Sequence, residues 1–438
     1  MSKLCENKVL YRLPFAVFLS GIMFLFIMLT GNSVGISEED LVLTSLLFSL
    51  LYLGVLCVFA ALKEFDNITL LFVAAAVAAL ICIRVSLLHF ASRDYNVFLS
   101  QWLSQMREYK GLEALRVQIG DYNMPYLYFL FIISKFNLSD LVLIKWFSCV
   151  FDFVCAFFVM KCVGLKFQNI FVKIAAFFTA LALPTVLMNS AYWGQCDSIL
   201  AAGIVASFYF LLKGNGRLAT VMFALAFSFK LQAIFVLPAF IVAIIVGKVK
   251  LKDLIYFPLT FIATLLPAIF AGRSIIDSLS IYFMQTTQYP ELTLNAPSVY
   301  QLISNKASFE SFNFLGIMLS GLCALLLIFL CFVFKDKIGQ KQLVLVFFLS
   351  SLLLPFLLPR MHERYFFIAD ILSIIYLFYN PKRWYFSFIT VFASYNACAN
   401  YLSGGNLLIE QKYCAIALLI TIILLTKELV SNLKDCGE

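Results

Sequence analysis

The chain has 438 residues, 63% of them apolar and 13% charged, with 48 phenylalanines and a mean hydropathy of +0.96. This composition excludes a soluble globular protein, because the apolar share of such proteins is nearer half. The net charge of +8 does not indicate nucleic-acid binding, since the basic residues stand in short loops beside apolar runs, where they orient membrane helices. We therefore predict a multi-pass membrane protein whose partners include the lipid bilayer and no nucleic acid.

The apolar runs predict an all-α membrane protein of about 13–15 helical segments, folded as one domain over residues 1–438. The first run follows a basic N-terminus and is too long for a signal-peptide core, so we expect it to remain as an anchor. The runs lie at 13–31, 42–61, 68–90, 124–137, 139–160, 170–188, 194–213, 217–229, 231–247, 255–271, 312–334, 341–358, 362–380, 384–402 and 412–427. Most of the twelve cysteines fall inside these runs without metal-ligand spacing, which favours a packing role.

The longest markedly polar stretch is the loop 91–123, which has an Asp-Tyr pair near each end, Asp94-Tyr95 and Asp121-Tyr122. Both carboxylates are expected at the membrane boundary and near each other, where either could act as a general base. Solvated loop carboxylates are the alternative. Between the pairs, apolar residues recur at helical spacing and predict an amphipathic helix in the membrane interface: Leu99, Trp102, Leu103 and Met106.

The distribution of basic residues predicts which loops share a face of the membrane. With the N-terminus inside, three spans place the loop 91–123 on the outer face. If the short segment 124–137 dips into the membrane and returns, the later basic clusters fall inside, and the turn 195–197, the loop 272–311 and the turn 359–365 fall outside. A full crossing by 124–137 would instead scatter the polar motifs over both faces.

Four of the ionisable residues that lie in or beside apolar runs carry separate predictions. Lys230 stands between two short apolar segments, which predicts a buried cation that faces a cavity and a partner, with snorkelling to the interface as the alternative. Asp152 is expected to pair with a polar group inside the bundle. Arg84 and His89, near the end of the third span, are expected to anchor that helix at the interface.

Two polar turns carry further candidates. Asp197 is either an N-cap of the helix that it opens or part of a polar site. Arg360 and Arg364 suit a phosphate clamp that Glu363 could orient, although a salt-bridged interfacial turn would have the same composition. His362 with Glu363 is too little for a metal site, and the need for a divalent metal stays open.

Five stretches in this order resemble a known group: GDYNMPYLY, PTVLMNSAYWGQCDSI, AFSFKLQAIFVLP, LTLNAPSVYQL and RMHERYFF. Together with the preceding Asp-Tyr loop, they are similar to the bacterial integral-membrane glycosyltransferases of the GT-C superfamily, and most of all to relatives of the second mannosyltransferase of GPI-anchor assembly. The likeness runs from about residue 90 to about residue 370. One departure is that two spans precede the third helix, whereas these enzymes usually place the catalytic loop after their first helix.

The resemblance implies inverting transfer of a hexose (mannose, glucose or galactose class) from a polyprenyl-phosphate donor to a glycan or lipid-linked acceptor. The reaction would take place on the outer face of a bacterial cytoplasmic membrane. Asp94 is the implied base, with Asp121 as the second candidate. The implied donor-phosphate residues are Lys230, Arg360, His362 and Arg364. The implied sugar or acceptor residues are Tyr95, Tyr122, Asn123, Trp193, Gln195, Asp197, Gln232, Asn295, Tyr300 and Glu363.

Other functions are compatible with a polytopic helical protein. A transporter or flippase of lipid-linked sugars commonly has paired repeats, and the sequence has no convincing internal repeat. A polymerase or ligase of lipid-linked glycans would share the architecture and differ in the acceptor. A nucleotide-sugar donor is disfavoured, because the chain has no cytosolic domain or glycine-rich loop to hold it. The oligomeric state stays open.

Overall fold

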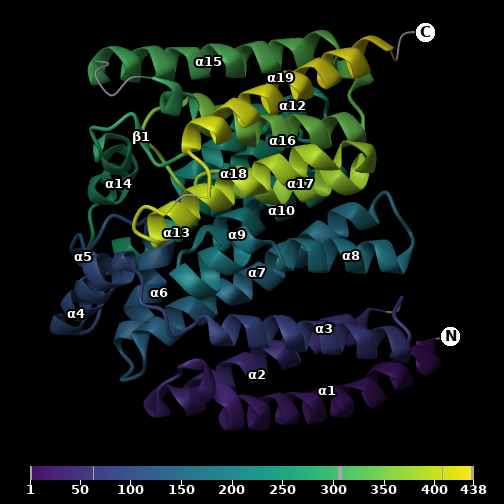
Figure 1. Cartoon of the computed structure of the whole chain (residues 1–438), viewed down its shortest axis with the longest axis vertical. Coiled ribbons are helices and arrows are strands. Elements are labelled where there is room, and N and C mark those ends of the chain that lie inside the picture. The colour runs from purple at the N-terminus through teal and green to yellow at the C-terminus, as the bar shows by residue number, and fades with distance from the viewer. Residues whose placement is uncertain (1, 63, 304–307, 407, 436–438) are drawn as a thin grey trace.

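The computed structural model describes residues 2–62, 64–303, 308–406 and 408–435. Over these residues the chain forms nineteen α-helices, several short 3-10 and π turns, and two strands of two residues each (Figure 1). The predicted all-α membrane fold is confirmed. Residues 304–307, which belong to the predicted loop 272–311, lie outside the described residues.

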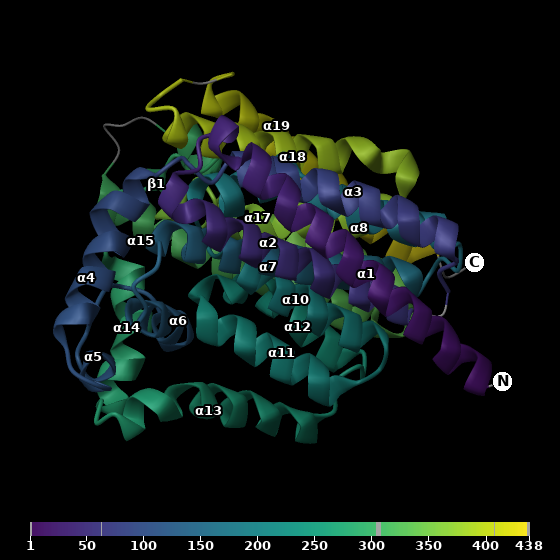
Figure 2. The same ribbon diagram turned by 90° about the horizontal axis from the view of Figure 1, so that it is seen from below.

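The first three helices form one side of the molecule (Figures 1 and 2). Two of them begin at a capping side chain. Ser37 Oγ accepts the Asp40 amide at 3.2 Å, and Asp66 Oδ1 accepts the Thr69 amide at 2.6 Å, so each cap satisfies a donor that the helix itself leaves free. This layer consists of α1 (Ser2–Thr30), α2 (Glu38–Ala61) and α3 (Asn67–Ser86).

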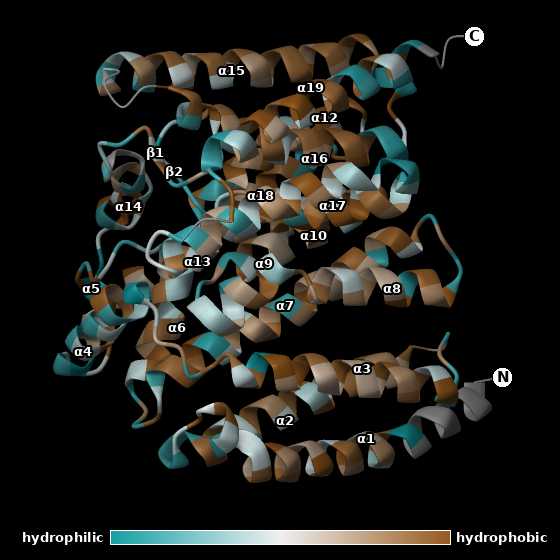
Figure 3. Cartoon of the chain, in the orientation of Figure 1, coloured by the Kyte–Doolittle hydropathy of each residue, from teal (hydrophilic) through white to brown (hydrophobic). Residues whose placement is uncertain are grey.

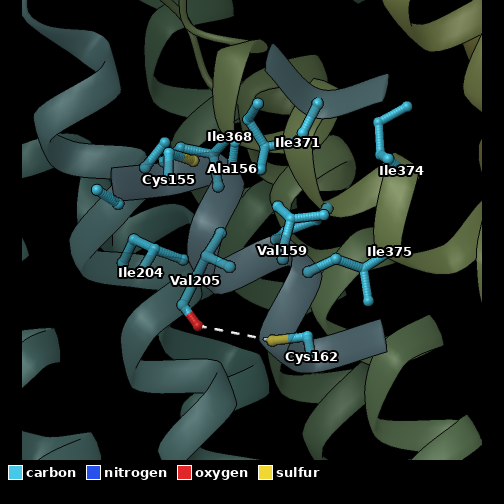
Figure 4. Packing of buried hydrophobic residues seen from close by; sticks show 14 of the residues in the cluster. Cys155, Ala156, Val159, Cys162, Ile204, Val205, Ile368, Ile371, Ile374 and Ile375 are labelled. Carbon is cyan, nitrogen blue, oxygen red and sulfur yellow. Dashed lines mark hydrogen bonds between the residues drawn. The ribbon is translucent and has the colours of Figure 1, made fainter. Parts of the chain in front are cut away.

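The centre of the molecule is a helix bundle with an apolar core. Figure 4 shows Val159 and Cys162 of α7 beside Val205 of α10 and Ile371 of α17, and the Cys162 thiol lies 3.9 Å from the Val205 carbonyl oxygen. The ten cysteines whose side chains are described are free thiols, buried or partly buried, as expected of packing residues. The bundle comprises α7 (Asp140–Gly164), α8 (Ile170–Leu181), α9 (Pro184–Leu187), α10 (Asp197–Leu212), α11 (Gly216–Phe229), α16 (Gln340–Leu357) and α17 (Phe367–Tyr379).

A buried ion pair joins the first layer to this bundle. Arg84 of α3 is fully buried, and its Nη2 lies 3.0 Å from Asp152 Oδ2 of α7. Ser190 and Ser198 also donate hydrogen bonds to Asp152. The predicted internal partner of Asp152 is therefore confirmed. The prediction that Arg84 anchors α3 at the interface is wrong, because the buried carboxylate draws the guanidinium inward, whereas His89 is exposed.

The remaining long helices cover the bundle with apolar surfaces. Phe314 and Leu325 of α15 and Phe270 of α13 are exposed, and Figure 3 shows α15 mostly in the brown of hydrophobic residues. An apolar outer face is what a bilayer requires of a helix. These helices are α12 (Leu237–Ile245), α13 (Tyr256–Phe270), α15 (Phe309–Val333), α18 (Trp384–Leu402) and α19 (Gln411–Asp435).

Among the described residues, eight helices are long and apolar enough to cross a membrane, or nine if α8 and α9, which are bent by 47°, count as one span. The chain is therefore a multi-pass membrane protein. The run 124–137 forms α6 (Met124–Ser134), whose eleven residues extend about 16 Å at 1.5 Å per residue. That length is about half of the hydrocarbon core, which agrees with a segment that does not cross by itself.

The polar loops gather at one end of the molecule, where α4, α5, α6 and α14 lie together (Figures 1 and 2). The predicted amphipathic helix is confirmed: after a π turn at Tyr95–Leu99, α4 buries Leu103 and Met106 and exposes Arg107. This end contains α4 (Ser100–Glu108), α5 (Glu113–Arg116), α14 (Ile275–Thr287), β1 (Thr293–Leu294) and β2 (Met361–His362).

Candidate active site

The loop 91–123 is bound to α14 by side-chain amides. Gln285 donates to the Asp121 carbonyl at 2.7 Å and to Asn123 Oδ1 at 3.0 Å. Gln288 donates to Asp121 Oδ2 at 2.9 Å. Arg273, which precedes α14, donates to the Val117 carbonyl at 2.7 Å. Two loops that are more than 150 residues apart in the sequence therefore form one unit.

The turn 359–365 joins the same unit through a small parallel sheet. β1 pairs with β2, and the Arg360 amide donates to the Leu292 carbonyl at 2.9 Å. Asn295 bridges His362, and both Asn295 (φ 61°) and Arg360 (φ 63°) have a left-handed backbone. Such a conformation costs a non-glycine residue on the order of 1 kcal/mol, so the strand pairing holds Arg360 in an orientation that an isolated turn would rarely adopt.

A cavity of about 340 Å³ lies between these loops and the bundle. Its polar residues come from the loop 91–123, the break after α11, the end of α14 and the residues after it, the start of α15 and the turn 359–365. Seven of the residues predicted from the sequence line it: Asp121, Tyr122, Lys230, Gln232, Arg360, His362 and Arg364. The sequence thus located much of the wall of one cavity.

Lys230 is buried and paired, as predicted. Helix α11 ends at Phe229, and the extended backbone of Lys230 (φ −148°, ψ 137°) turns its side chain toward α10. Its Nζ lies 2.5 Å from Asp197 Oδ1, while Asn189 Nδ2 donates to Asp197 Oδ2 at 2.8 Å. The N-cap alternative for Asp197 is wrong, because the residue is the first of α10 and its carboxylate binds these side chains; the cap position is Cys196, which makes no side-chain cap.

Arg364 shares the same carboxylate. Its Nε lies 3.6 Å from Asp197 Oδ2, and its Nη1 lies 2.9 Å from Glu363 Oε1. Burial acts to lower the pKa of Arg364, but the Glu363 and Asp197 carboxylates outweigh it and hold that pKa well above its ordinary value. The guanidinium, 5.4 Å from the centre of the Trp193 ring, is therefore a permanent charge on the cavity wall.

Arg360 differs from the other two cations, since among the described residues it forms no ion pair with a carboxylate. One guanidinium nitrogen donates to the Thr286 carbonyl, and Nε has no described hydrogen-bond partner. Phe309 lies 5.2 Å from the guanidinium carbon. The centre of the neighbouring His362 ring lies 5.0 Å from the centre of the Tyr289 ring. Arg360 is thus the cavity cation with the least compensated charge.

Asp94 lies outside the cavity lining but is connected to it. Its Oδ2 accepts hydrogen bonds from Gln195 at 2.6 Å and Trp193 at 3.1 Å, and its Oδ1 accepts one from Tyr401 at 2.5 Å. Gln195 Oε1 in turn accepts the Tyr122 hydroxyl at 3.1 Å, and Tyr122 lines the cavity. The side-chain amide of Gln195 thus connects the Asp94 carboxylate to Tyr122 in the cavity wall.

Tyr289 lies within electrostatic range of both candidate carboxylates. Burial, followed by the negative charges of Asp121 and Asp94, raises the pKa of Tyr289. Both carboxylates of the loop 91–123 therefore raise the pKa of the same phenol, that of Tyr289. Among the described residues, neither of them forms an ion pair, so their negative charges are not neutralised by a neighbouring cation.

Other predicted residues lie away from the cavity. The Tyr95 phenol is near the ion pair that Arg107 Nη2 forms with Asp140 Oδ1 at 2.6 Å. Tyr300 donates to the Leu357 carbonyl at 2.8 Å. Three further residues do not line the cavity but pair with residues that do: Asn123, Asn295 and Glu363.

The fold brings to this place several residues that were not predicted from the sequence. Gln285 lies in the last turn of α14, and Gln288 and Tyr289 follow that helix, whose amphipathic pattern and polar end were a usable signal. No feature of the sequence indicates Tyr401, because its position beside Asp94 depends on how α18 packs. Among the described residues, no group of three or more His, Cys, Asp or Glu side chains could hold a metal ion.

No curated protein matches the chain. The family model of glycosyltransferase family 87 matches residues 125–359, which is more than half of the chain. The match includes Asp197 and Lys230 and agrees with the GT-C type that the motifs resemble, while Asp94 and Tyr401 lie outside it. A multi-pass helical fold, a cavity with charged walls and this match lead to one conclusion: the chain belongs to glycosyltransferase family 87.

Proposed function

We propose that this glycosyltransferase moves a hexose from a polyprenyl-phosphate donor to a glycan or lipid-linked acceptor, with inversion at the anomeric carbon. The observation that carries the proposal is the mixed lining of the cavity, which combines the cations Lys230, Arg360 and Arg364 with apolar side chains. A sugar phosphate with a long hydrocarbon tail needs both kinds of group, whereas a soluble nucleotide sugar needs only the charged ones.

The apolar part of the lining supports a lipid-linked donor. It includes Ile234, which follows Lys230, and Ile317 of α15, a candidate membrane span. These two side chains are 38% and 51% exposed, so they belong both to the cavity and to the outer surface of the helices. An isoprenoid chain that lies between α15 and the segment after Lys230 would remain in the bilayer while its phosphate reaches the cations.

The cations of the lining support a phosphate group as the leaving group. Lys230 and Arg364 already share Asp197, so they offer the donor a positioned but partly compensated charge. Arg360 has no carboxylate partner among the described residues, and its planar donor groups suit phosphate oxygens. Arg360 is therefore the principal phosphate-binding residue, with His362 beside it. Its guanidinium stabilises the negative charge that develops on the phosphate as the bond to the sugar breaks.

Asp94 is the proposed base, with Asp121 as the second candidate. The carboxylate takes the proton of the acceptor hydroxyl while that oxygen attacks the anomeric carbon. The bond from that carbon to the donor phosphate breaks, and its electron pair leaves on the phosphate oxygen. Three neutral donors orient Asp94, whereas Gln288 is the one described residue that bonds the Asp121 carboxylate. Asp94 is thus better fixed for proton transfer.

The proposed sugar and acceptor groups surround this base. Tyr122, Trp193 and Gln195 connect Asp94 with the cavity, and Gln232 lines it. Gln232 Oε1 is buried without a described hydrogen-bond partner, which suits a sugar hydroxyl as donor. The likeness to relatives of the GPI-anchor mannosyltransferase favours mannose within the hexose class.

The chain is proposed to be one membrane domain over 1–438 with the site on its outer face. The loop 91–123 and the turn 359–365, which the charge distribution assigns to that face, are both hydrogen-bonded to the loop 272–311. The membrane is proposed to be the bacterial cytoplasmic membrane, where polyprenyl-phosphate sugars can serve as outward-facing donors. A polymerase or ligase would use the same cavity with a larger acceptor.

Reconstitution with defined donors tests the proposal. The purified protein in lipid nanodiscs is incubated with polyprenyl-phosphate mannose, glucose or galactose, or with the matching nucleotide sugars, and with glycan and lipid-linked acceptors. Sealed proteoliposomes with the same donors report movement of sugar across the bilayer. We expect glycosylated product from a polyprenyl-phosphate donor only, and an inverted anomeric configuration by NMR. Product from nucleotide sugars, or sugar movement across the bilayer without a new glycosidic bond, would refute the proposed donor and favour, respectively, another transferase class or a flippase.

A further inference from the structure

Tyr401 approaches the proposed base from the far end of the chain. It lies at the C-terminal end of α18, 307 positions after Asp94, and its hydroxyl donates to Asp94 Oδ1 at 2.5 Å. Neither residue lies in the range that matches the glycosyltransferase family model. The contact therefore depends on the packing of α18 against the loop 91–123.

The Tyr401 ring is fixed as well as its hydroxyl. It stacks on Trp193 with ring centres 5.1 Å apart and planes 25° from parallel. Trp193 is 1% exposed, and its indole nitrogen donates to the other oxygen of Asp94. Each of the two stacked aromatic side chains thus donates a hydrogen bond to one oxygen of the Asp94 carboxylate. Gln195 donates a third hydrogen bond to that carboxylate at 2.6 Å.

The three donors leave a defined part of the carboxylate free. An ionised carboxylate has about four acceptor positions on its two oxygens. Oδ2 accepts from both Trp193 and Gln195, whereas Oδ1 accepts from Tyr401 alone among the described residues. One acceptor position therefore remains on Oδ1, and the direction of the Tyr401 hydroxyl determines where it points.

We propose that Tyr401 is a positioning residue that directs the free acceptor position of Asp94 Oδ1 toward the hydroxyl of the glycosyl acceptor. The inference rests on the proposed function of Asp94 as the base. It assigns a role in the reaction to α18. The phenol touches Asp94 and acts on the substrates through that carboxylate.

A purely structural role for Tyr401 makes a different prediction. In that case the residue would matter through its stacking on Trp193, and the loss of its hydroxyl would change neither turnover nor substrate affinity. Tyr401→Phe separates the two roles, because it keeps the ring and removes the donor. Tyr395→Phe is a matched control, since Tyr395 lies on the same helix and its hydroxyl has no hydrogen bond to the described residues.

The experiment measures kcat and both KM values of the full-length protein in nanodiscs, together with its thermal unfolding midpoint. We expect Tyr401→Phe to lower kcat by about tenfold, the effect typical of a lost hydrogen bond to a charged group, with unchanged KM values and midpoint. Tyr395→Phe should behave as the wild type. A wild-type kcat for Tyr401→Phe, or a loss that the control shares, would overturn the inference.

A double-mutant cycle separates this inference from the function on which it rests. Tyr401→Phe should cause no further loss in an Asp94→Asn background, because the group that it orients is gone. If Asp94→Asn keeps its activity, the proposed base is wrong and the inference falls with it. If Asp94→Asn is inactive but Tyr401→Phe is fully active, only the inference about Tyr401 fails.

Discussion

Lys230 Nζ lies 2.5 Å from Asp197 Oδ1, and both side chains are buried. Arg364 reaches the other oxygen of the same carboxylate from the turn 359–365. One aspartate at the start of α10 therefore holds two cations on the wall of the cavity. The positions of both cations depend on this carboxylate.

This arrangement predicts the effect of Asp197→Asn. Removing the charge leaves two buried cations without a shared partner, so we expect a loss of stability of about 3–5 kcal/mol and loss of transfer activity. Unfolding of the purified protein measures the first effect. The double variant Lys230→Met/Asp197→Leu should be less destabilised than Asp197→Asn. A loss of stability equal to the sum of the two single-substitution losses would show that the pair is not coupled.

Arg360 should determine the affinity for the donor. Arg360→Gln is expected to raise the KM for the polyprenyl-phosphate sugar by about tenfold or more, because a charge-assisted bond to phosphate is lost, with a smaller effect on the KM for the acceptor. Arg360→Lys should restore part of the affinity. Lys382→Gln, at an exposed position outside the cavity, is the control. An unchanged donor KM in Arg360→Gln would rule out this role.

The Arg84–Asp152 pair should serve the fold and not the reaction. Both side chains are fully buried, and no cavity-lining residue of the candidate site bonds to them. Arg84→Met is expected to destabilise the protein by about 3–5 kcal/mol, while Arg84→Met/Asp152→Leu should recover a large part of that loss. Variants that remain folded should keep their KM values. A specific change in donor KM without a change in stability would show that this pair belongs to the site.

Labelling with a membrane-impermeant maleimide tests the arrangement in the membrane. Arg93→Cys and Glu291→Cys replace exposed residues in the two polar loops, and Lys382→Cys replaces an exposed residue in the turn before α18. In sealed, right-side-out vesicles we expect the first two to react from outside and the third to react only after permeabilisation. Reaction of only one of the first two would break the proposal that both loops share the outer face.

The sequence predicted the features that depend on one element at a time. The spacing of Leu103 and Met106 located α4, and the cost of an unpaired charge in an apolar run predicted that Lys230 and Asp152 would have partners. These inferences need only helix geometry and the energetics of burial.

What the sequence did not predict depends on which helices are neighbours. Arg84 appeared to be an interface residue because nothing in its own helix reveals a carboxylate on α7. Tyr401 appeared to be an ordinary end of an apolar helix, although it contacts Asp94. Conversely, Tyr95 and Tyr300 stood in polar stretches that are near the site, but their own contacts lie elsewhere.

We propose that Asp94, held beside a cavity for a lipid-linked donor, is the base of glycosyl transfer. The most direct measurement is the rate of acceptor-dependent release of polyprenyl phosphate in a single turnover by Asp94→Asn, Asp121→Asn and the wild type. Asp277→Asn, an exposed carboxylate of α14, is the control. We predict a loss of about 100-fold or more for Asp94→Asn, as expected when general-base catalysis is removed, and a smaller loss for Asp121→Asn. Wild-type rates for a folded Asp94→Asn variant would contradict the account.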